Sequence, residues 1–124
     1  MSASHQNLTD KELIELAAKA AGFEGEWQRD TNFVQERYCF EISYINQGMM
    51  TSVEWNPLRE DGAALRLAVR LSINVMFIGN VVRCFRSEED FVAVDEEIEY
   101  FFDDKQKAVR RAIVRCAAKL GELM

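Results

Sequence analysis

The chain has 124 residues, of which 48% are apolar, and a formal net charge of -6 at pH 7. Its length and apolar content suit one domain with its own core. The acidic surplus argues against sequence-independent nucleic-acid binding and against binding to an anionic membrane surface. No apolar run approaches the roughly 20 residues of a membrane span, and the polar start lacks the apolar core of a secretion signal. We therefore expect a cytoplasmic protein with a flexible tail over residues 1–7 and a single domain over residues 8–124.

Cysteine and histidine usage argues against the common metal and nucleophile systems. Cys39, Cys84 and Cys116 stand far apart without a C-x-x-C pair, and the only histidine, His5, lies in the predicted tail. Thiols with apolar neighbours are typical of reduced cysteines in a core. We predict no metal site and no cofactor, and a Cys-His or Ser-His-Asp system cannot be assembled without a usable histidine.

A helix is predicted to begin after Thr9. Thr9 and Glu12 have the spacing of a capping box, and Gly22 supplies the left-handed residue that commonly ends a helix. The apolar residues between them share one face: Leu13, Leu16, Ala17 and Ala20. From Gly22 to Phe33 we expect a loop.

The apolar period changes to two from Arg37 to Trp55, which indicates strands. One face of the first strand carries Tyr38, Phe40, Ile42 and Tyr44. Turn residues follow at positions 46–48, and a second alternating run ends at Trp55. The two runs predict an antiparallel hairpin.

The only proline marks the start of a second helix. Asn56 is pushed toward extended geometry by Pro57, and Asp61 is predicted to cap the helix by accepting hydrogen bonds from its first amides. Apolar residues then cover most of the helix circumference, so we expect a well-buried helix. Arg66 and Arg70, one turn apart, form its narrow polar edge.

Further strands and a last helix complete the chain. Gly79 and Asn80 form a dipeptide suited to a tight primed turn between two apolar runs, and the segment 91–94 predicts a short additional strand. Asp103 or Asp104 is expected to cap the last helix.

The coarse order is helix, two strands, helix, two or three strands, helix, which predicts an α+β fold with helices on an antiparallel or mixed sheet. Gly121 is expected to end the last helix, after a buried stripe of Val109, Ala112, Ile113, Cys116 and Leu120. Hairpins between most strands, and the lack of glycine fingerprints, argue against a doubly wound nucleotide-binding sheet.

Residues 8–21, 55–62, 64–69 and 112–121 together resemble the bacteriophage ABA sandwich domain family. The resemblance covers about half of the chain. It implies a three-layer α/β/α sandwich, here with a four- to five-stranded sheet and three helices, in a phage or prophage protein of the host cytoplasm. It implies no catalytic residues, because the function of the family is largely unassigned.

One aromatic residue and four arginines are the candidate ligand-binding residues. Trp55, beside a helix start, could stack a planar ligand, while Arg66, Arg70, Arg110 and Arg111 could converge on a small anionic group. The alternative is structural: Trp55 packs in the core, and the arginines pair with carboxylates.

An acidic run between Glu88 and Asp104 contains nine carboxylates and no lysine or arginine. Within it, Glu96, Glu97 and Glu99 are candidate partner-binding residues. A solvated acidic face or a divalent-cation site are the alternatives, although the spacing matches no calcium loop.

These observations predict a non-enzymatic phage or prophage accessory protein that acts by binding, and that sequesters a small nucleotide-like host signal. One alternative is an acidic protein-interaction module that blocks a host protein; another is a small carboxylate-dependent hydrolase. Exposed sheet edges, together with Met49 and Met50, favour a homodimer.

Overall fold

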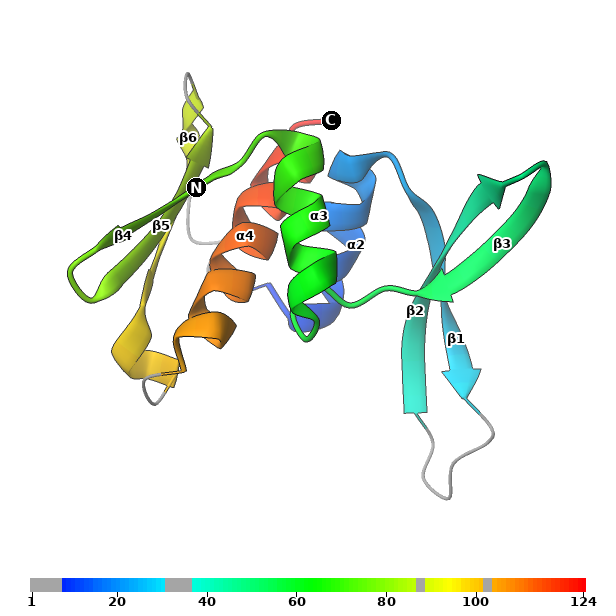
Figure 1. The fold of residues 1–124 in the computed structure, drawn as a ribbon, viewed down its shortest axis with the longest axis horizontal. Coiled ribbons are helices and arrows are strands. Elements are labelled where there is room, and N and C mark those ends of the chain that lie inside the picture. Colours follow the sequence, from blue (N-terminus) through cyan, green and yellow to red (C-terminus); the bar gives the residue numbers. More distant parts are fainter. Residues whose placement is uncertain (1–7, 31–36, 87–88, 102–103) are drawn as a thin grey trace.

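The computed structural model describes residues 8–30, 37–86, 89–101 and 104–124, and these residues form an α+β fold, as predicted. Their helices form a central layer, and two three-stranded antiparallel sheets flank this layer (Figure 1). The expected tail over residues 1–7 and one of the two proposed helix caps, Asp103, lie outside the described residues.

The prediction of one four- to five-stranded sheet between layers of helices is wrong. The described strands form two separate sheets of order β1-β2-β3 and β4-β5-β6, and the helices lie between the sheets (Figure 1). The cause is the position of α3 (Asp61–Leu71) in the chain. This helix separates the strands into two groups, and each group pairs within itself, because neighbouring hairpins close locally.

The predicted hairpin forms β2 (Arg37–Asn46) and β3 (Met49–Glu54). Gln47 and Gly48 connect the two strands and have φ angles of 52° and 80°. Positive φ at both central residues is the signature of a type I′ turn, whose twist matches that of the flanking strands.

The expected loop is wrong over β1 (Glu24–Asp30), which pairs antiparallel with β2. Apart from Trp27, this segment offers no large apolar residue, so its sequence carries little strand signal. Pairing places Trp27 opposite Phe40 and Gly25 opposite Ile42. A Cβ atom at Gly25 would lie 2.4 Å from the Phe40 ring, so a glycine is required for the aromatic ring to lie across β1.

The first helix, α2 (Asp10–Ala21), has the predicted termini. Thr9 and Glu12 form the capping box, and Gly22 adopts the left-handed conformation with φ of 78°. These local signals were sufficient because both involve residues within one turn of the helix end.

The second helix, α3, forms where predicted, but its start and its burial differ from prediction. Its N-cap is Glu60, whose side chain makes no capping hydrogen bond, and the carboxylate of Asp61 accepts instead from Arg110. Leu65 and Val69 are 64% and 72% exposed, because the neighbouring elements cover only one side of this helix.

The second sheet contains β4 (Asn74–Ile78), β5 (Val81–Arg86) and β6 (Glu89–Glu97). The predicted additional strand is therefore confirmed and is longer than expected. Gly79 has a φ of 57° whereas Asn80 does not have a positive φ, which is the pattern of a type II′ turn.

The last helix, α4 (Lys105–Glu122), follows a short 3-10 turn, η1 (Ile98–Phe101), and lies at the centre of the molecule. Asp104 caps it by accepting from the amide of Lys107 at 3.0 Å, as predicted. Half of its residues are buried, because α2 packs on one side and β5 and β6 on another: Ala108, Ala112, Ile113, Val114, Cys116, Ala117, Ala118, Leu120 and Gly121.

Gly121 does not end α4, contrary to prediction, but lies inside it. A Cβ atom at Gly121 would lie 2.1 Å from the carbonyl oxygen of Leu16 in α2. The glycine therefore permits the backbones of α2 and α4 to touch, which a sequence pattern cannot distinguish from a helix stop signal.

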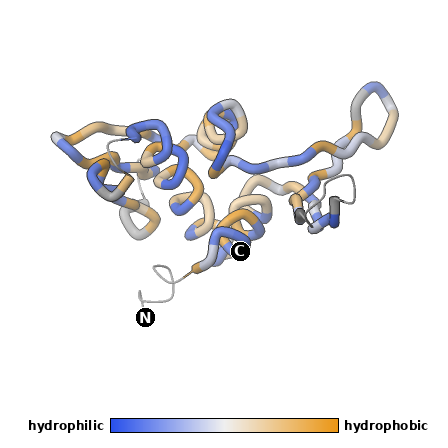
Figure 2. Tube along the Cα trace, turned by 90° about the horizontal axis from the view of Figure 1, so that it is seen from below, coloured by the Kyte–Doolittle hydropathy of each residue, from blue (hydrophilic) through white to orange (hydrophobic). Residues whose placement is uncertain are grey.

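Hydrophobic and hydrophilic residues recur in turn along the helices, as expected for helices with one covered side and one open side (Figure 2). In the part of the chain that the structure describes, no helix combines the length and the apolar character needed to cross a membrane.

Replacing Gly121 should separate α2 from α4. We predict that Gly121→Ala lowers the free energy of unfolding by about 1–3 kcal/mol or more, since the new methyl group meets backbone that cannot rotate away. Chemical denaturation monitored by circular dichroism measures this change.

Gly62→Ala is the matched control. Its new Cβ atom would meet only the flexible end of Arg66, at 3.2 Å, in the first turn of α3. Its stability should be equal to or above that of the unaltered protein, because alanine favours the helix. Equal losses in both variants would contradict the close approach of α2 and α4.

Candidate functional site

A cleft of about 560 Å³ lies between the first sheet and α3. This volume suits a small ligand, since such sites usually measure roughly 300–1,000 Å³. Its walls combine aromatic and aliphatic side chains with two arginines and two glutamates: Phe23, Ile42, Tyr44, Val53, Glu54, Trp55, Glu60, Ala63, Arg66, Leu67 and Arg70. The structure therefore brings together Trp55, Arg66 and Arg70, three of the five predicted ligand-binding residues.

Aromatic rings form the base of this cleft. Trp55 is only 6% exposed and meets Phe23 edge-on, with ring centroids 5.5 Å apart, and Phe40 at 6.4 Å. The structural alternative for Trp55, packing in the core, is thus confirmed. Tyr44 also lines the cleft and is 42% exposed, so it offers a ligand more ring surface than Trp55 does.

Arg70 is held in position on the α3 wall. Its Nε donates to the carbonyl oxygen of Ala21, the last residue of α2, at 2.6 Å. Its guanidinium lies 4.8 Å from the centroid of the Phe23 ring. A cation at a helix C-terminus and over an aromatic face is stabilised by both, so this side chain is ordered before any ligand arrives.

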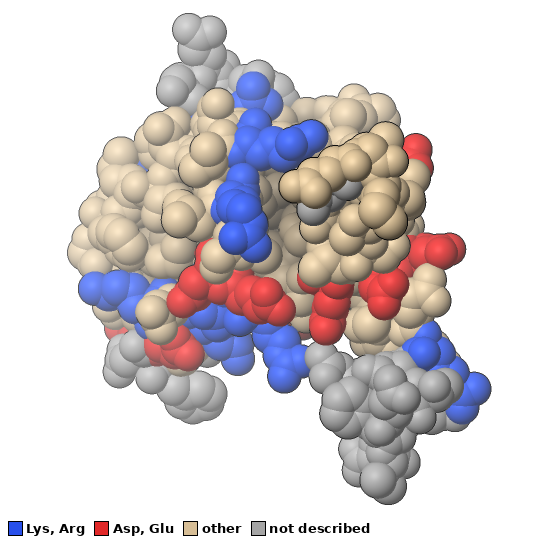
Figure 3. Space-filling view, turned by 45° about the vertical axis from the view of Figure 1, so that its right-hand side comes forward, with Lys and Arg blue, Asp and Glu red and all other residues tan. Residues whose placement is uncertain are grey.

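Arg66 lies one helical turn before Arg70 and also lines the cleft. Within the described part of the chain, no hydrogen bond or ion pair engages its side chain. Lys and Arg side chains form a column on one face of the molecule, and Asp and Glu side chains lie beneath it (Figure 3). Arg66 therefore has its full set of guanidinium donors available to an anion.

Two carboxylates, those of Glu54 and Glu60, complete the polar part of the lining. An anionic group and hydrogen-bond donors of one ligand could thus be bound at different places in the cleft. Sequence reasoning missed Glu54 and Tyr44 as members of this site. A signal for Tyr44 existed, because strand alternation places it on the same face of β2 as the buried Phe40 and Ile42.

Arg110 and Arg111 do not join this cleft. Arg110 donates to the carboxylate of Asp61 at 2.7 Å and to the carbonyl oxygen of Leu58 at 2.9 Å. Arg111 donates to Asp10 at 2.9 Å. Both arginines connect α4 to neighbouring elements, which agrees with the structural alternative for these two residues.

Part of the acidic run is engaged within the protein. Glu96 is 12% exposed at its side chain and accepts from Arg115, and its carboxylate lies 4.0 Å from Arg111. Glu99 accepts from Asn80 at 2.8 Å. Of the three predicted partner-binding residues, only Glu97 combines an exposed position with a side chain that makes no ion pair or hydrogen bond in the described regions. Glu88 lies outside those regions.

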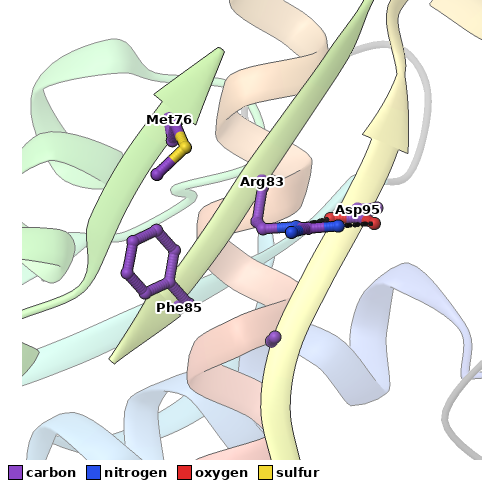
Figure 4. Close-up of a pocket in the computed structure, with 5 residues that line it drawn as sticks. Met76, Arg83, Phe85 and Asp95 are labelled. Atoms are coloured by element: carbon purple, nitrogen blue, oxygen red, sulfur yellow. Dashed lines mark hydrogen bonds and ion pairs between the residues drawn. The ribbon is translucent and has the colours of Figure 1, made fainter. Parts of the chain in front are cut away.

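A second cavity, of about 480 Å³, lies on the outer face of the second sheet (Figure 4). Arg83 on β5 and Asp95 on β6 point toward each other there and make hydrogen bonds of 2.7 and 3.0 Å. This pair lowers the pKa of Asp95 and raises that of Arg83, chiefly through the side-chain hydrogen bonds. The two charges satisfy each other, so this cavity is a weaker ligand site than the cleft.

The buried thiol of Cys84 is not activated. Cys84 and Cys116 are fully buried, as predicted, while Cys39 is half-buried. Burial is the largest cause that raises the pKa of Cys84 to about 12, which keeps this thiol protonated at neutral pH. No three His, Cys, Asp or Glu side chains of the described segments are grouped so as to hold a metal ion.

No family model, no curated protein and no solved structure matches this chain. The resemblance to the phage ABA sandwich family and the phage or prophage origin therefore stay predictions.

The Arg83–Asp95 pair should make stability depend on pH. Since the pKa of Asp95 is lowered in the folded protein, its contribution is present above the ordinary carboxyl pKa and is lost as the pH falls. We predict that Asp95→Asn reduces the loss of unfolding free energy between about pH 6 and about pH 3. Urea denaturation of both proteins at both pH values measures this loss of unfolding free energy.

Glu97→Gln provides the control, because Glu97 lies on the same strand and has no ion pair within the described residues. It should not reproduce the effect of Asp95→Asn. If both variants behaved alike, the pH dependence would arise from general charge repulsion and not from this pair.

Proposed function

We propose that this chain is a binding protein that takes a small nucleotide-like molecule into the cleft between the first sheet and α3. The observation that carries the proposal is the position of Arg66, which has no internal partner in the described structure, beside the ordered Arg70 and above an aromatic base. Guanidinium groups that are not neutralised internally favour an anionic ligand.

The lining fits the separate parts of a nucleotide. A planar base can rest against Tyr44, a phosphate can accept hydrogen bonds from Arg66 and Arg70, and amino or hydroxyl groups can donate to Glu60. Arg70 is already ordered, so binding would cost less side-chain entropy there than at a mobile arginine.

Sequestration is the form of function that follows from such a site in a phage or prophage accessory protein. The proposed protein would withhold a nucleotide-like signal from the host by holding it in the cleft. The acidic-module alternative has less support, since internal partners engage Glu96 and Glu99.

Binding should be measurable with the intact protein. We predict that at least one member of a panel of mono-, di- and cyclic nucleotides raises the melting temperature, and that calorimetry gives a one-to-one complex. Arg66→Gln should weaken this binding roughly tenfold to a hundredfold, the effect of one lost hydrogen bond to a charged group.

Arg59→Gln is the matched control, because it makes the same charge change at an exposed position outside the cleft lining. It should bind as the unaltered protein does. Arg70→Gln should weaken binding and also lower stability, because the bond to Ala21 is lost. No response to any nucleotide, or equal weakening by Arg59→Gln and Arg66→Gln, would refute the proposal.

A further inference from the structure

The strand β4 forms an open edge of the second sheet. The sheet order places it outermost, and all five of its residues are exposed. Its sequence, Asn-Val-Met-Phe-Ile, contains no charge and no proline, and the irregularity in this sheet lies between β5 and β6. Natural proteins usually protect such edges with these devices, so an unprotected apolar edge indicates pairing with another strand.

An apolar groove adjoins this edge. It measures about 400 Å³ and lies between β4, α3 and α4, with Leu65, Val75, Phe77, Val109 and Ile113 among its lining residues. The groove exists because α4 covers β5 and β6 and leaves the inner side of β4 open.

We propose that a second copy of this chain covers this surface, with the two β4 strands paired antiparallel about a two-fold axis at Met76. The second sheet of one copy would then continue into the second sheet of the other copy, which gives one sheet of six strands across the dimer. This interface lies on the opposite side of α3 from the Arg66 cleft, so the proposal does not depend on the proposed ligand.

The backbone of β4 suits this register. The two-residue turn at Gly79 and Asn80 closes on a hydrogen-bonded pair, Ile78 with Val81. Non-hydrogen-bonded and hydrogen-bonded pairs then alternate along the ladder between β4 and β5. Val75 and Phe77 consequently direct their N–H and C=O groups toward the free edge. An axis at Met76 places Val75 opposite Phe77 of the second copy, so that each outward donor meets an outward acceptor.

The side chains agree with the same register. Residues directly opposite across a sheet lie on one face. Phe77 of the second copy would therefore lie on the same face of the sheet as Val75 and Phe77 of the first copy, and would extend the apolar groove of the first copy. On the outer face the two copies of Met76 would meet, close to Phe85, which lines the same cavity as Met76 (Figure 4).

The apolar surface exposed around β4 is close in area to the surface that each partner buries in a stable dimer. The side chains concerned are Leu65, Val69, Val75, Met76, Phe77 and Ile78, which are 38–72% exposed. Together they present on the order of 600 Å² per chain, against roughly 800 Å² per partner in a standard interface.

Charge also permits two copies to meet here. Although the chain carries a net charge of -6, the one carboxylate in the groove lining, Asp61, is paired with Arg110 at 2.7 Å. Lys105 lies 5.4 Å from the Phe77 ring centroid at the groove rim. Association of two copies through this groove therefore does not bring unpaired carboxylates of the groove lining together.

The test measures the molar mass in solution over a wide range of protein concentration, by light scattering coupled to size-exclusion chromatography. We expect a mass twice that of the 14.3 kDa chain. Phe77→Lys should raise the dimer dissociation constant about tenfold or more, because it places a charge in the interface. Met50→Lys, at the exposed tip of the other sheet, should leave the dimer intact.

Cross-linking tests the register even if Phe77→Lys fails to fold. In a Cys39→Ser background, Met76→Cys should form a covalent dimer under mild oxidation, because non-hydrogen-bonded neighbours across antiparallel strands lie within disulfide distance. Met50→Cys should not. A monomer at all concentrations, or a dimer that persists in folded Phe77→Lys and does not cross-link through Met76→Cys, would overturn the proposal.

Discussion

The close contact of α2 and α4 is the constraint on which the rest of the molecule depends. The backbones meet where Gly121 faces the carbonyl of Leu16, and alanines on both helices extend the contact. Small residues let two helices approach closely and pack at high density. With α4 fixed in this way, its remaining surface must be covered by other elements, and the second sheet and α3 provide that cover.

Charged residues on α4 attach it to β6 without burying an isolated charge. Arg111, Arg115 and Lys119 follow at four-residue intervals and reach Glu96 and the carbonyl oxygens of Asp95 and Ala93. Within the acidic run, Asp95 and Glu96 thus compensate arginines of the same chain. The net charge of -6 therefore does not imply one continuous acidic face.

The two sides of α3 have opposite character, and both proposals arise from this asymmetry. Arg66 and Arg70 face the cleft beside the first sheet, while Leu65 lines the apolar groove beside β4. Each side is open because α3 packs mainly on α4 and neither sheet lies close against it. One helix thereby separates a polar ligand site from an apolar interface.

Local chemistry in the sequence determined the starts of α2 and α4 and two tight turns: the capping box at Thr9, the cap at Asp104, and the glycine turns at Gly48 and Gly79. These features involve residues within a few positions of each other, and no distant contact replaces them here, whereas at the start of α3 the predicted cap Asp61 pairs with the distant Arg110. Tertiary structure alone decided the pairing of β1, the division into two sheets and the role of Gly121, because each depends on segments that are far apart in sequence. The same holds for the cleft: the residue types of Trp55, Arg66 and Arg70 suggested an anion site, but only packing showed that Arg110 and Arg111 are engaged elsewhere.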